Sequence, residues 1–288
     1  MLDLVSGREK RLGAGWKILA FLLVLGLVNG LAFFLMEKVL GLGRLLHGPA
    51  GEPISALLLL GVSWAALRLD GRPLASLGLR LDSRWARELA FGILAGFLLI
   101  LAAALLLRIV GGFTWALGPA AWRAMLGGGW MFLFVAISEE MTFRGYPFQR
   151  LVEGLGPWSA QALFAALFAL IHWGNPGIHS AGPTLKAVTT LNIALAAILL
   201  GLAYLRTRSL ALPIGIHWAW NWTQGSLLGF SVSGTGLPVA PFKPLLNARP
   251  DWITGGPVGL EGSAACTLVC LAFIGLLLAW RGSAPEEA

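Results

Sequence analysis

Long apolar stretches dominate the pattern along the chain, and short clusters of charged residues, glycine and proline separate them. Eight of these stretches are candidate membrane spans: Trp16–Met36, Ile54–Leu67, Leu89–Leu107, Ala124–Ser138, Trp158–Ile171, Ala187–Leu205, Leu210–Phe230 and Ser263–Trp280. A spanning helix needs roughly 20 apolar residues, so the third, sixth and seventh stretches are long enough, whereas the second, fourth and fifth are short. We expect the short ones to tilt, to thin the bilayer or to lie partly inside the protein.

This pattern and the composition together predict the fold class. No stretch alternates between apolar and polar residues as the strands of a membrane barrel do, whereas helices satisfy their backbone hydrogen bonds within each segment. Of the 288 residues, 57% are hydrophobic and 12% are charged, and the mean hydropathy is +0.77. The charged fraction is about half that of an average soluble domain. The sequence therefore predicts an all-α integral membrane protein, a bundle of about eight transmembrane helices.

Lysine and arginine are distributed unevenly between the two sides of this predicted bundle. With the N-terminus inside, 14 of them lie on the cytoplasmic side: Arg8, Lys10, Arg11, Lys17, Arg68, Arg72, Arg80, Arg84, Arg87, Arg144, Arg150, Arg206, Arg208 and Arg281. The other seven lie outside: Lys38, Arg44, Arg108, Arg123, Lys186, Lys243 and Arg249. The excess predicts that both termini are cytoplasmic, in a multi-pass protein of the inner cell membrane.

The net charge of +7 therefore indicates orientation and contact with the anionic lipid bilayer. Because the basic residues are spread over short loops, we expect no nucleic-acid partner. The basic N-terminus is not expected to be a cleaved signal peptide, since Trp16–Met36 is too long for the apolar region of one. Cys266 and Cys270 lie one helical turn apart in the last span, where packing is a more economical interpretation than a metal or redox pair.

Polar residues divide the chain into a scaffold and a working part. The first three predicted spans contain no carboxylate or histidine in their interiors, so we interpret residues 1–123 as a scaffold, with an interfacial connector at Arg72–Gly92. Residues 124–230 carry the polar groups, and residues 231–288 form an external loop rich in Gly and Pro, a last span and a cytoplasmic tail. This asymmetry is unlike an inverted-repeat transporter, in which polar breaks occur at matching places in both halves.

The stretch "AISEEMTFRG", residues 136–145, places three charges at the end of an almost uncharged run. Arg144 follows Glu140 by four residues, which puts the two on one helical face in the favourable order for an ion pair. Glu139 is rotated by about 100° from Glu140 and remains unmatched. A charge at the bilayer centre costs about 2.5–3.5 kcal/mol, so the alternative is that both carboxylates lie in headgroup water at the helix end.

Two further apolar segments each supply polar groups. "LFAALFALIHWGNPG" places His172 four residues after Phe168, just before the helix stops at Gly174 and Pro176. "LPIGIHWAWNWTQG" places His217 and Asn221 on one face of a helix. Taken singly, each has a plain structural alternative, an interfacial histidine for His172 and a polar bridge between helices for the His217–Asn221 pair.

Together these groups form a set suited to hydrolysing a peptide bond. A carboxylate and an imidazole can take a proton from water and deliver it to the leaving amine. An imidazole and an amide can donate hydrogen bonds to the oxyanion of the tetrahedral intermediate. No serine or cysteine has a base at a readable spacing, so water is the more economical nucleophile. The sequence contains no short zinc-binding motif, although Glu139, His172 and His217 from separate helices could still assemble a site for a divalent metal such as zinc.

In order along the chain, "EEMTFR" (Glu139–Arg144), "FALIH" (Phe168–His172) and "HWAWN" (His217–Asn221) resemble the EExxxR, FxxxH and HxxxN/D motifs of the CPBP family. These intramembrane proteases are related to the type II CAAX prenyl endopeptidase and to bacteriocin-processing and self-immunity proteins, also called the ABI family. The resemblance covers roughly residues 127–229, and "GNP" after His172 and "RTRSLALP" before His217 resemble bacterial members.

The resemblance implies eight transmembrane helices with a site inside the membrane, open toward the cytosol. It implies that Glu139 activates water with help from His172, that His217 and Asn221 stabilise the oxyanion, and that Glu140 and Arg144 hold the helix. It leaves open whether the enzyme is glutamate-type or metal-dependent, as in a metalloprotease.

The resulting hypothesis is an intramembrane endopeptidase, a hydrolase of a membrane-embedded, membrane-bound or lipidated peptide or protein, acting near the cytoplasmic interface. One alternative is a non-catalytic immunity or peptide-binding protein that uses the same cavity. Another is a transporter or channel, which the missing repeat disfavours.

Overall fold

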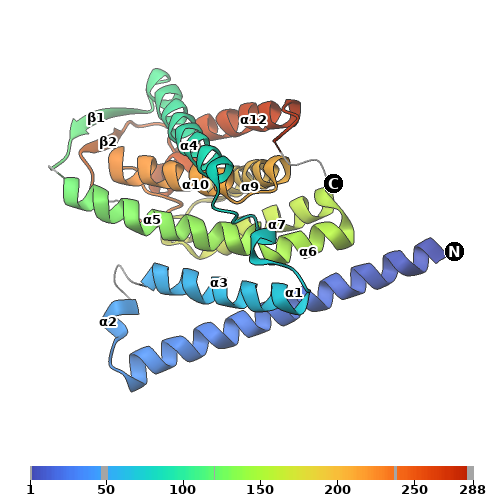
Figure 1. The fold of residues 1–288 in the computed structure, drawn as a ribbon. Helices are drawn as coiled ribbons and strands as arrows, with labels where there is room; N and C mark the ends of the chain where they lie inside the picture. Colours follow the sequence, from blue (N-terminus) through green and yellow to red (C-terminus); the bar gives the residue numbers. More distant parts are fainter. Residues whose placement is uncertain (1, 47–50, 120, 237–238, 284–288) are drawn as a thin grey trace.

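The computed structural model describes residues 2–46, 51–119, 121–236 and 239–283, and 77% of it is helical (Figure 1). The end of the predicted cytoplasmic tail, residues 284–288, lies outside the described residues. The elements are α1 (Leu2–Phe34), α2 (Gly43–Leu46), α3 (Gly51–Leu69), α4 (Ser83–Ile109), β1 (Phe113–Leu117), α5 (Trp122–Phe143), α6 (Tyr146–Leu155), α7 (Pro157–Ile171), α8 (Pro176–His179), α9 (Pro183–Thr207), α10 (Ala211–Trp222), β2 (Phe242–Leu246), α11 (Asp251–Thr254) and α12 (Ala264–Ala279). The helical fold class agrees with the prediction.

The long helices give the bundle two distinct ends (Figure 1). We call the end where α1 begins and where α3, α9 and α12 finish the termini end. There, Arg206 of α9 donates hydrogen bonds to the carbonyls of Leu277 and Leu278 in α12, and Leu210 donates its N–H to Gly78. We call the opposite end, where β1 and β2 lie, the strand end.

Within the described residues, four helices are long and apolar enough to cross a membrane: Gly13–Val39, Gly51–Leu69, Ser83–Ile109 and Pro183–Thr207. The predicted second span, Ile54–Leu67, was drawn too short, since α3 has 19 residues. The predicted interfacial connector, Arg72–Gly92, is wrong in its second half, because α4 already begins at Ser83. The Asp82 side chain caps α4 by accepting the Trp85 N–H at 2.8 Å, so charged residues in the first turn do not delay the helix. The total of eight spans and the orientation remain predictions.

The structure also contains elements that the hydropathy pattern did not indicate. α6 follows Gly145 at once, with Pro147 in its first turn, and its apolar face packs against α1. β1 and β2 form a two-stranded antiparallel sheet in which Phe113 pairs with Leu246, so the chain is not helical throughout. The loop predicted as irregular therefore contains a strand and a short helix. Five-residue strands are too short for periodicity to reveal them.

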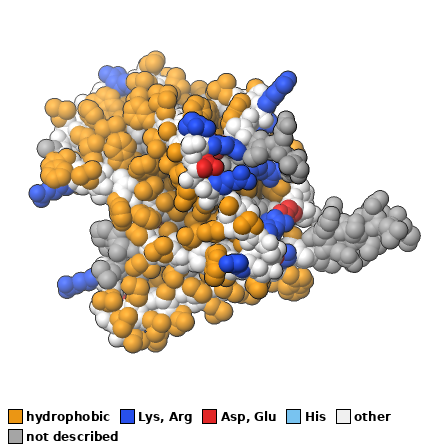
Figure 2. All heavy atoms as spheres, in the orientation of Figure 1, with side chains coloured by type: hydrophobic (Ala, Val, Ile, Leu, Met, Phe, Trp, Pro, Cys, Tyr) orange, Lys and Arg blue, Asp and Glu red, His pale blue; other side chains and the backbone are white. Residues whose placement is uncertain are grey.

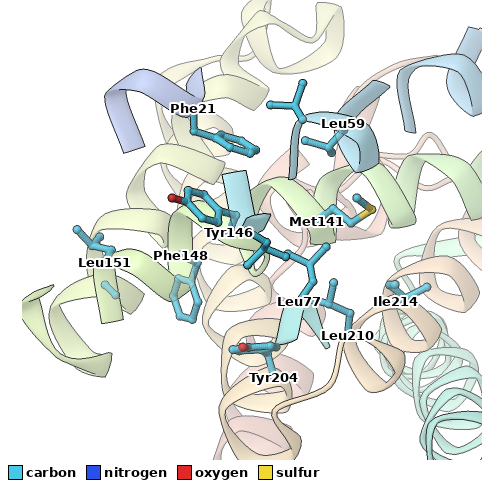
Figure 3. Packing of buried hydrophobic residues seen from close by; sticks show 13 residues of the cluster. Phe21, Leu59, Leu77, Met141, Tyr146, Phe148, Leu151, Tyr204, Leu210 and Ile214 are labelled. Atoms are coloured by element: carbon cyan, nitrogen blue, oxygen red, sulfur yellow. The ribbon is translucent and has the colours of Figure 1, made fainter. Parts of the chain in front are cut away.

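A buried apolar cluster closes the termini end of the bundle (Figure 3). It joins α1, α3, α5, α6, α9 and α10 through side chains that include Phe21, Leu59, Leu77, Met141, Tyr146, Phe148, Leu151, Tyr204, Leu210 and Ile214. Phe21 stacks on Tyr146 with ring centroids 5.2 Å apart. Met141 follows the two glutamates of α5 directly, so the packing of this cluster holds in place the part of α5 that carries them.

Charged side chains at the termini end form one connected group, the termini-end cluster of Lys17, Asp70, Arg72, Arg150 and Glu153. Asp70 accepts from Lys17 at 2.8 Å and from Arg150 at 3.2 Å, and Glu153 accepts from Arg72 at 2.7 Å. Tyr146 also donates its hydroxyl to Asp70 at 3.2 Å. On the face drawn in Figure 2, apolar side chains cover the middle and most basic side chains gather toward this end.

Glycines bring α4 and α10 into backbone contact. A Cβ atom on Gly92 or Gly96 of α4 would lie 2.5 Å from the Leu212 carbonyl oxygen or 2.2 Å from that of Ile216. A Cβ on Gly215 of α10 would lie 2.5 Å from the Leu89 carbonyl oxygen. Small residues on both helices therefore permit this close approach, as in other membrane helix pairs. The contact fixes α10, the helix that carries His217 and Asn221.

Candidate active site

A cavity of about 390 Å³ lies inside the bundle, and four of the six predicted site residues line it: Glu139, His172, His217 and Asn221. Glu139 comes from α5, His172 from the turn after α7, and the other two from α10. The remaining wall is mostly apolar and includes Val135, Phe168, Leu200 and Trp220. Residues far apart in the sequence thus meet around one space, as the prediction required.

Glu140 is fully buried beneath this cavity and connects three helices. Its Oε1 accepts a hydrogen bond from Arg144 Nη1 at 3.0 Å and one from His217 Nδ1 at 2.8 Å. Arg144 also donates from Nη2 to the carbonyl of Ala197 in α9 at 2.8 Å. The Glu140–Arg144 pair expected from the spacing is present. Its second function, holding the His217 ring, was not predicted, because nothing in the sequence shows which face of α10 approaches α5.

Glu139 lies at the cavity wall with less support. Its side chain is 30% exposed, and its Oε2 is 3.7 Å from His217 Nε2, within ion-pair reach but too long for a hydrogen bond. Oε2 is shielded from the surroundings yet makes no hydrogen bond within the described part of the protein. The alternative that both glutamates lie in headgroup water does not describe Glu140, which is fully buried.

His172 and Asn221 complete the cavity wall. His172 Nδ1 donates to the Phe168 carbonyl at 2.6 Å, which leaves Nε2 as an acceptor. Phe168 also lies between the two histidines, with its ring 4.6 Å from that of His172 and 6.3 Å from that of His217. Asn221 is buried, and its amide makes no hydrogen bond to any residue that the structure describes. No hydrogen bond joins His172 to Glu139 or His217 among the described residues, although all three side chains line the same cavity.

The cavity contains one acidic residue that the sequence analysis did not single out, Glu261. Its Oε2 accepts from the Ser233 N–H, from the Ser233 hydroxyl at 3.0 Å and from Gln224 Nε2 at 3.2 Å. Burial raises the pKa of Glu261, against the opposing effect of the Ser233 hydrogen bonds and of nearby His172. Because Glu261 lies in a loop rich in glycine rather than in an apolar run, its burial left no signal in the sequence.

The residues of the cavity do not form a metal-binding group. Across the described ranges, no three His, Cys, Asp or Glu side chains are placed to hold one ion. His217 Nδ1 is engaged by Glu140, and the fixed cation Arg144 lies beside that carboxylate. Glu139, His172 and His217, which could assemble a zinc site, are thus not gathered around one ion position in this arrangement, and the choice between a glutamate-type and a metal-dependent enzyme stays a prediction. Cys266 and Cys270 are buried with their sulfur atoms 3.9 Å apart, as packing residues of the last helix.

Carboxylate, imidazole and amide groups thus surround one cavity inside a bundle of apolar helices, and groups of these kinds can transfer protons and stabilise an oxyanion. Residues 120–223 match the family described as type II CAAX prenyl endopeptidase Rce1-like. This segment is less than half of the chain, contains every predicted site residue and supports the resemblance to the CPBP family of intramembrane proteases. Neither a curated protein nor a solved structure shows significant similarity to the chain.

Proposed function

We propose that the protein is a glutamate-type intramembrane endopeptidase that hydrolyses a peptide bond of a membrane-associated substrate. The observation that carries the proposal is the Glu139 carboxylate at the wall of an apolar cavity, whose Oε2 makes no hydrogen bond to the described residues and lies 3.7 Å from His217 of another helix. The Rce1-like match over residues 120–223 supports a CAAX-type protease in general.

The charges around Glu139 favour uptake of a proton. We define the interior cluster as Glu139, Glu140, Arg144 and His217. It contains two carboxylates and one permanent cation, so with His217 neutral it carries one uncompensated negative charge. An uncompensated charge is costly in an apolar interior. A proton taken from water by Glu139 makes the cluster neutral, which is the change that a general base undergoes.

The proposed reaction uses one water molecule. Glu139 takes a proton from it as its oxygen attacks the carbonyl carbon of the peptide bond. The tetrahedral intermediate then collapses, the C–N bond breaks, and the proton passes from Glu139 to the leaving amine. His172 offers Nε2 as a second acceptor for this water, because its Nδ1 is committed to the Phe168 carbonyl.

His217 and Asn221 are proposed to stabilise the oxyanion. They lie one helical turn apart on α10, and α4 holds that helix through glycine contacts. Since His217 Nδ1 already donates to Glu140, donation from Nε2 requires a second proton on the ring, and once Glu139 holds the proton from water the added positive charge is balanced by the oxyanion itself. The Asn221 amide donates without any change of charge. Fixed donors of this kind are worth about 2.7–4 kcal/mol each in other enzymes.

The test replaces Glu139 by glutamine, which keeps the shape and removes the base. Peptide termini in membranes from cells with the wild-type protein are compared with those from Glu139→Gln cells at equal expression. We expect Glu139-dependent termini to disappear, a loss of at least about 10³-fold for a purified substrate. The matched control is Glu153→Gln, in the termini-end cluster and away from the cavity.

An unchanged set of termini in the Glu139→Gln membranes overturns the proposal. If a protective or binding phenotype persists in the same cells, the chain acts as a non-catalytic peptide-binding protein instead.

A further inference from the structure

We infer that Glu261 makes the cavity selective for a substrate segment that carries a lysine side chain next to the bond that is cleaved. The inference rests on the proposed peptidase function for the cleavage alone, because the binding of the ammonium group depends only on the residues around the cavity. Glu261 belongs to the short turn Leu260–Gly262 before α12, whereas the proposed base Glu139 belongs to α5. The two carboxylates therefore reach one cavity from separate parts of the chain.

The wall of the cavity contains acidic groups but no permanent cation. Among the described residues that line it, the carboxylates are Glu139 and Glu261, and the basic side chains are His172 and His217, without any lysine or arginine. With both histidines neutral, this wall carries two negative charges in mostly apolar surroundings. A positive group is therefore attracted into the cavity and a negative group is repelled.

Glu261 has no lysine or arginine beside it that could compensate its charge. Within the described part of the chain it forms no ion pair with such a side chain, and the basic group that acts on it is His172. His172 is neutral when its Nδ1 donates to the Phe168 carbonyl and its Nε2 accepts a hydrogen bond. Glu261 is only 9% exposed, so a bound ammonium group would offset the cost of an isolated buried carboxylate.

The two oxygens of the Glu261 carboxylate have different surroundings. Oε2 accepts from the Ser233 N–H, from the Ser233 hydroxyl at 3.0 Å and from Gln224 Nε2 at 3.2 Å. Oε1 makes no hydrogen bond to any residue that the structure describes, although the side chain lines the cavity. One oxygen thus fixes the carboxylate and the other is left for a ligand. A single oxygen suits the compact ammonium group of lysine better than the guanidinium group of arginine, which binds carboxylates through two parallel hydrogen bonds.

The backbone of Glu261 is also held in place. Asn192 of α9 donates from Nδ2 to the Glu261 carbonyl at 2.8 Å, and its Oδ1 accepts the hydroxyl of Thr267 in α12 at 2.6 Å. Gln224 lies in the π-helical turn Thr223–Leu227, which directly continues α10. Glu261 is therefore positioned by three helices before any ligand arrives, which lowers the entropic cost of binding.

Other polar groups in the same cavity also lack a hydrogen-bond partner. Asn221 is 6% exposed and lines the cavity, and its amide makes no hydrogen bond to the described residues. Oε2 of Glu139 makes none either. Because buried polar groups normally have partners, such groups around one cavity indicate a polar ligand. In the proposed reaction the peptide bond and water supply partners for Glu139 and Asn221, and a lysine of the substrate supplies the partner for Glu261.

The test measures binding without cleavage. The full chain carrying Glu139→Gln is purified in detergent, and the wild-type chain is measured in parallel. The probes are short, fluorescent, acetylated peptide amides of leucine and alanine that differ in one central residue. This residue is lysine, arginine or norleucine, which has a side chain like that of lysine without the ammonium group.

We expect the lysine peptide to bind at least about 10-fold more tightly than the norleucine peptide, the gain typical of a hydrogen bond to a charged group. Glu261→Gln, added to the same chain, should reduce this difference to about twofold or less. The matched control Glu153→Gln, in the termini-end cluster, should leave it unchanged. Equal binding of the lysine and norleucine peptides overturns the inference, as does a preference that survives Glu261→Gln. An arginine peptide that binds as tightly as the lysine peptide overturns the assignment of an ammonium group.

A carbodiimide gives a second readout that needs no variant of Glu261. The reagent joins a carboxylate to an amine in contact with it, and mass spectrometry identifies the joined residues. In the Glu139→Gln chain, the lysine peptide should be joined to Glu261. Coupling only to carboxylates outside the cavity overturns the inference.

Neither measurement requires cleavage, so both decide the role of Glu261 even if the comparison of peptide termini fails. When Glu139-dependent termini are found, lysine should be enriched beside the cleaved bonds. Cleavage sites without this enrichment overturn the inference as well.

Discussion

The termini-end cluster and the interior cluster contain the same kinds of side chain, yet their charges are arranged differently. In the termini-end cluster, three cations meet two carboxylates, and each oxygen of Asp70 has a partner. In the interior cluster, two carboxylates meet one permanent cation, and an oxygen of each glutamate lacks a hydrogen bond within the described residues. The first arrangement is suited to holding helices together, and the second leaves a carboxylate able to react.

The surroundings of the termini-end cluster strengthen this difference. Burial raises the pKa of Asp70, but hydrogen bonds and charges from Lys17, Tyr146 and Arg150 outweigh burial and leave it below its ordinary value. Burial, and then the neighbouring Asp70 carboxylate, raise the pKa of Tyr146 to about 12, so its hydroxyl remains a donor at any physiological pH. A carboxylate held in its charged form by three partners is a structural group rather than a base.

Removing the only permanent cation of the interior cluster should have the largest effect. Arg144→Leu leaves Glu140 buried and uncompensated, so we expect a loss of about 3–5 kcal/mol in unfolding free energy and no cleavage. Unfolding of the purified protein in detergent measures the change. The double variant Glu140→Gln/Arg144→Leu, which removes the stranded charge, should regain most of the stability. If the single variant were as stable as the wild type, Arg144 would not be the cation that compensates Glu140 in the interior cluster.

Removing the Asn221 amide should affect catalysis without affecting the fold. We expect Asn221→Ala to lower kcat about 10²–10³-fold and to change KM little, because an oxyanion donor acts in the transition state. Stability should stay within about 0.5 kcal/mol, since the amide makes no hydrogen bond to the described residues. Asn29→Ala in α1, away from the cavity, is the matched control. An unchanged kcat would exclude Asn221 from the oxyanion site.

Neutralising the termini-end cluster should affect the fold without affecting catalysis. Asp70→Asn removes the negative charge and one of the two acceptor oxygens that Lys17, Arg150 and Tyr146 share. We expect a loss of about 3 kcal/mol, the lower end for a broken buried pair, because Lys17 is half exposed. Cleavage per folded molecule should match the wild type. A parallel loss of cleavage would show that the two clusters are coupled.

The smallest expected effect is the response of the same cluster to acid. Because Asp70 has a lowered pKa in the folded state, its contribution is complete above its ordinary value of 3.8 and is lost as the pH falls through the folded value. Thermal unfolding of wild type and Asp70→Asn between about pH 6 and about pH 3 measures this. The difference in Tm should shrink toward acid pH. A constant difference would mean that the Asp70 charge contributes nothing.

Much of the fold could be predicted from the sequence because long apolar helices leave a strong pattern. The first and last residues of the helices were predicted less accurately. A hydropathy pattern ends a predicted span at the first charged residues, whereas the helix continues through them when they are capped or paired. Asp82 at the start of α4 and the Glu140–Arg144 pair at the end of α5 are two such places. α6 and the two strands were missed because their segments are short and their apolar contacts come from distant parts of the chain.

The candidate site was predictable as a set of residue types but not as a geometry. The i, i+4 spacings placed Glu140 beside Arg144, and His217 one helical turn before Asn221, since a helix fixes those relations. The contact between Glu140 and His217 depends on how α5 and α10 are rotated against each other, which periodicity does not specify. Glu261 belongs to a loop whose path is set by Ser233 and Gln224, and no local pattern identifies such a residue.

The backbone contact between α4 and α10 has a mechanical consequence for the cavity. A helix held at Gly92, Gly96 and Gly215 by its neighbour's main chain cannot turn or shift without a steric clash. The wall that bears His217 and Asn221 is therefore rigid. The opposing helices, α5 and α7, meet through side chains, such as the Phe143 and Phe168 rings 4.8 Å apart, so they form the more compliant wall. Widening of the cavity should then change the distance from Glu139 to His217 while the spacing of the two α10 side chains stays constant.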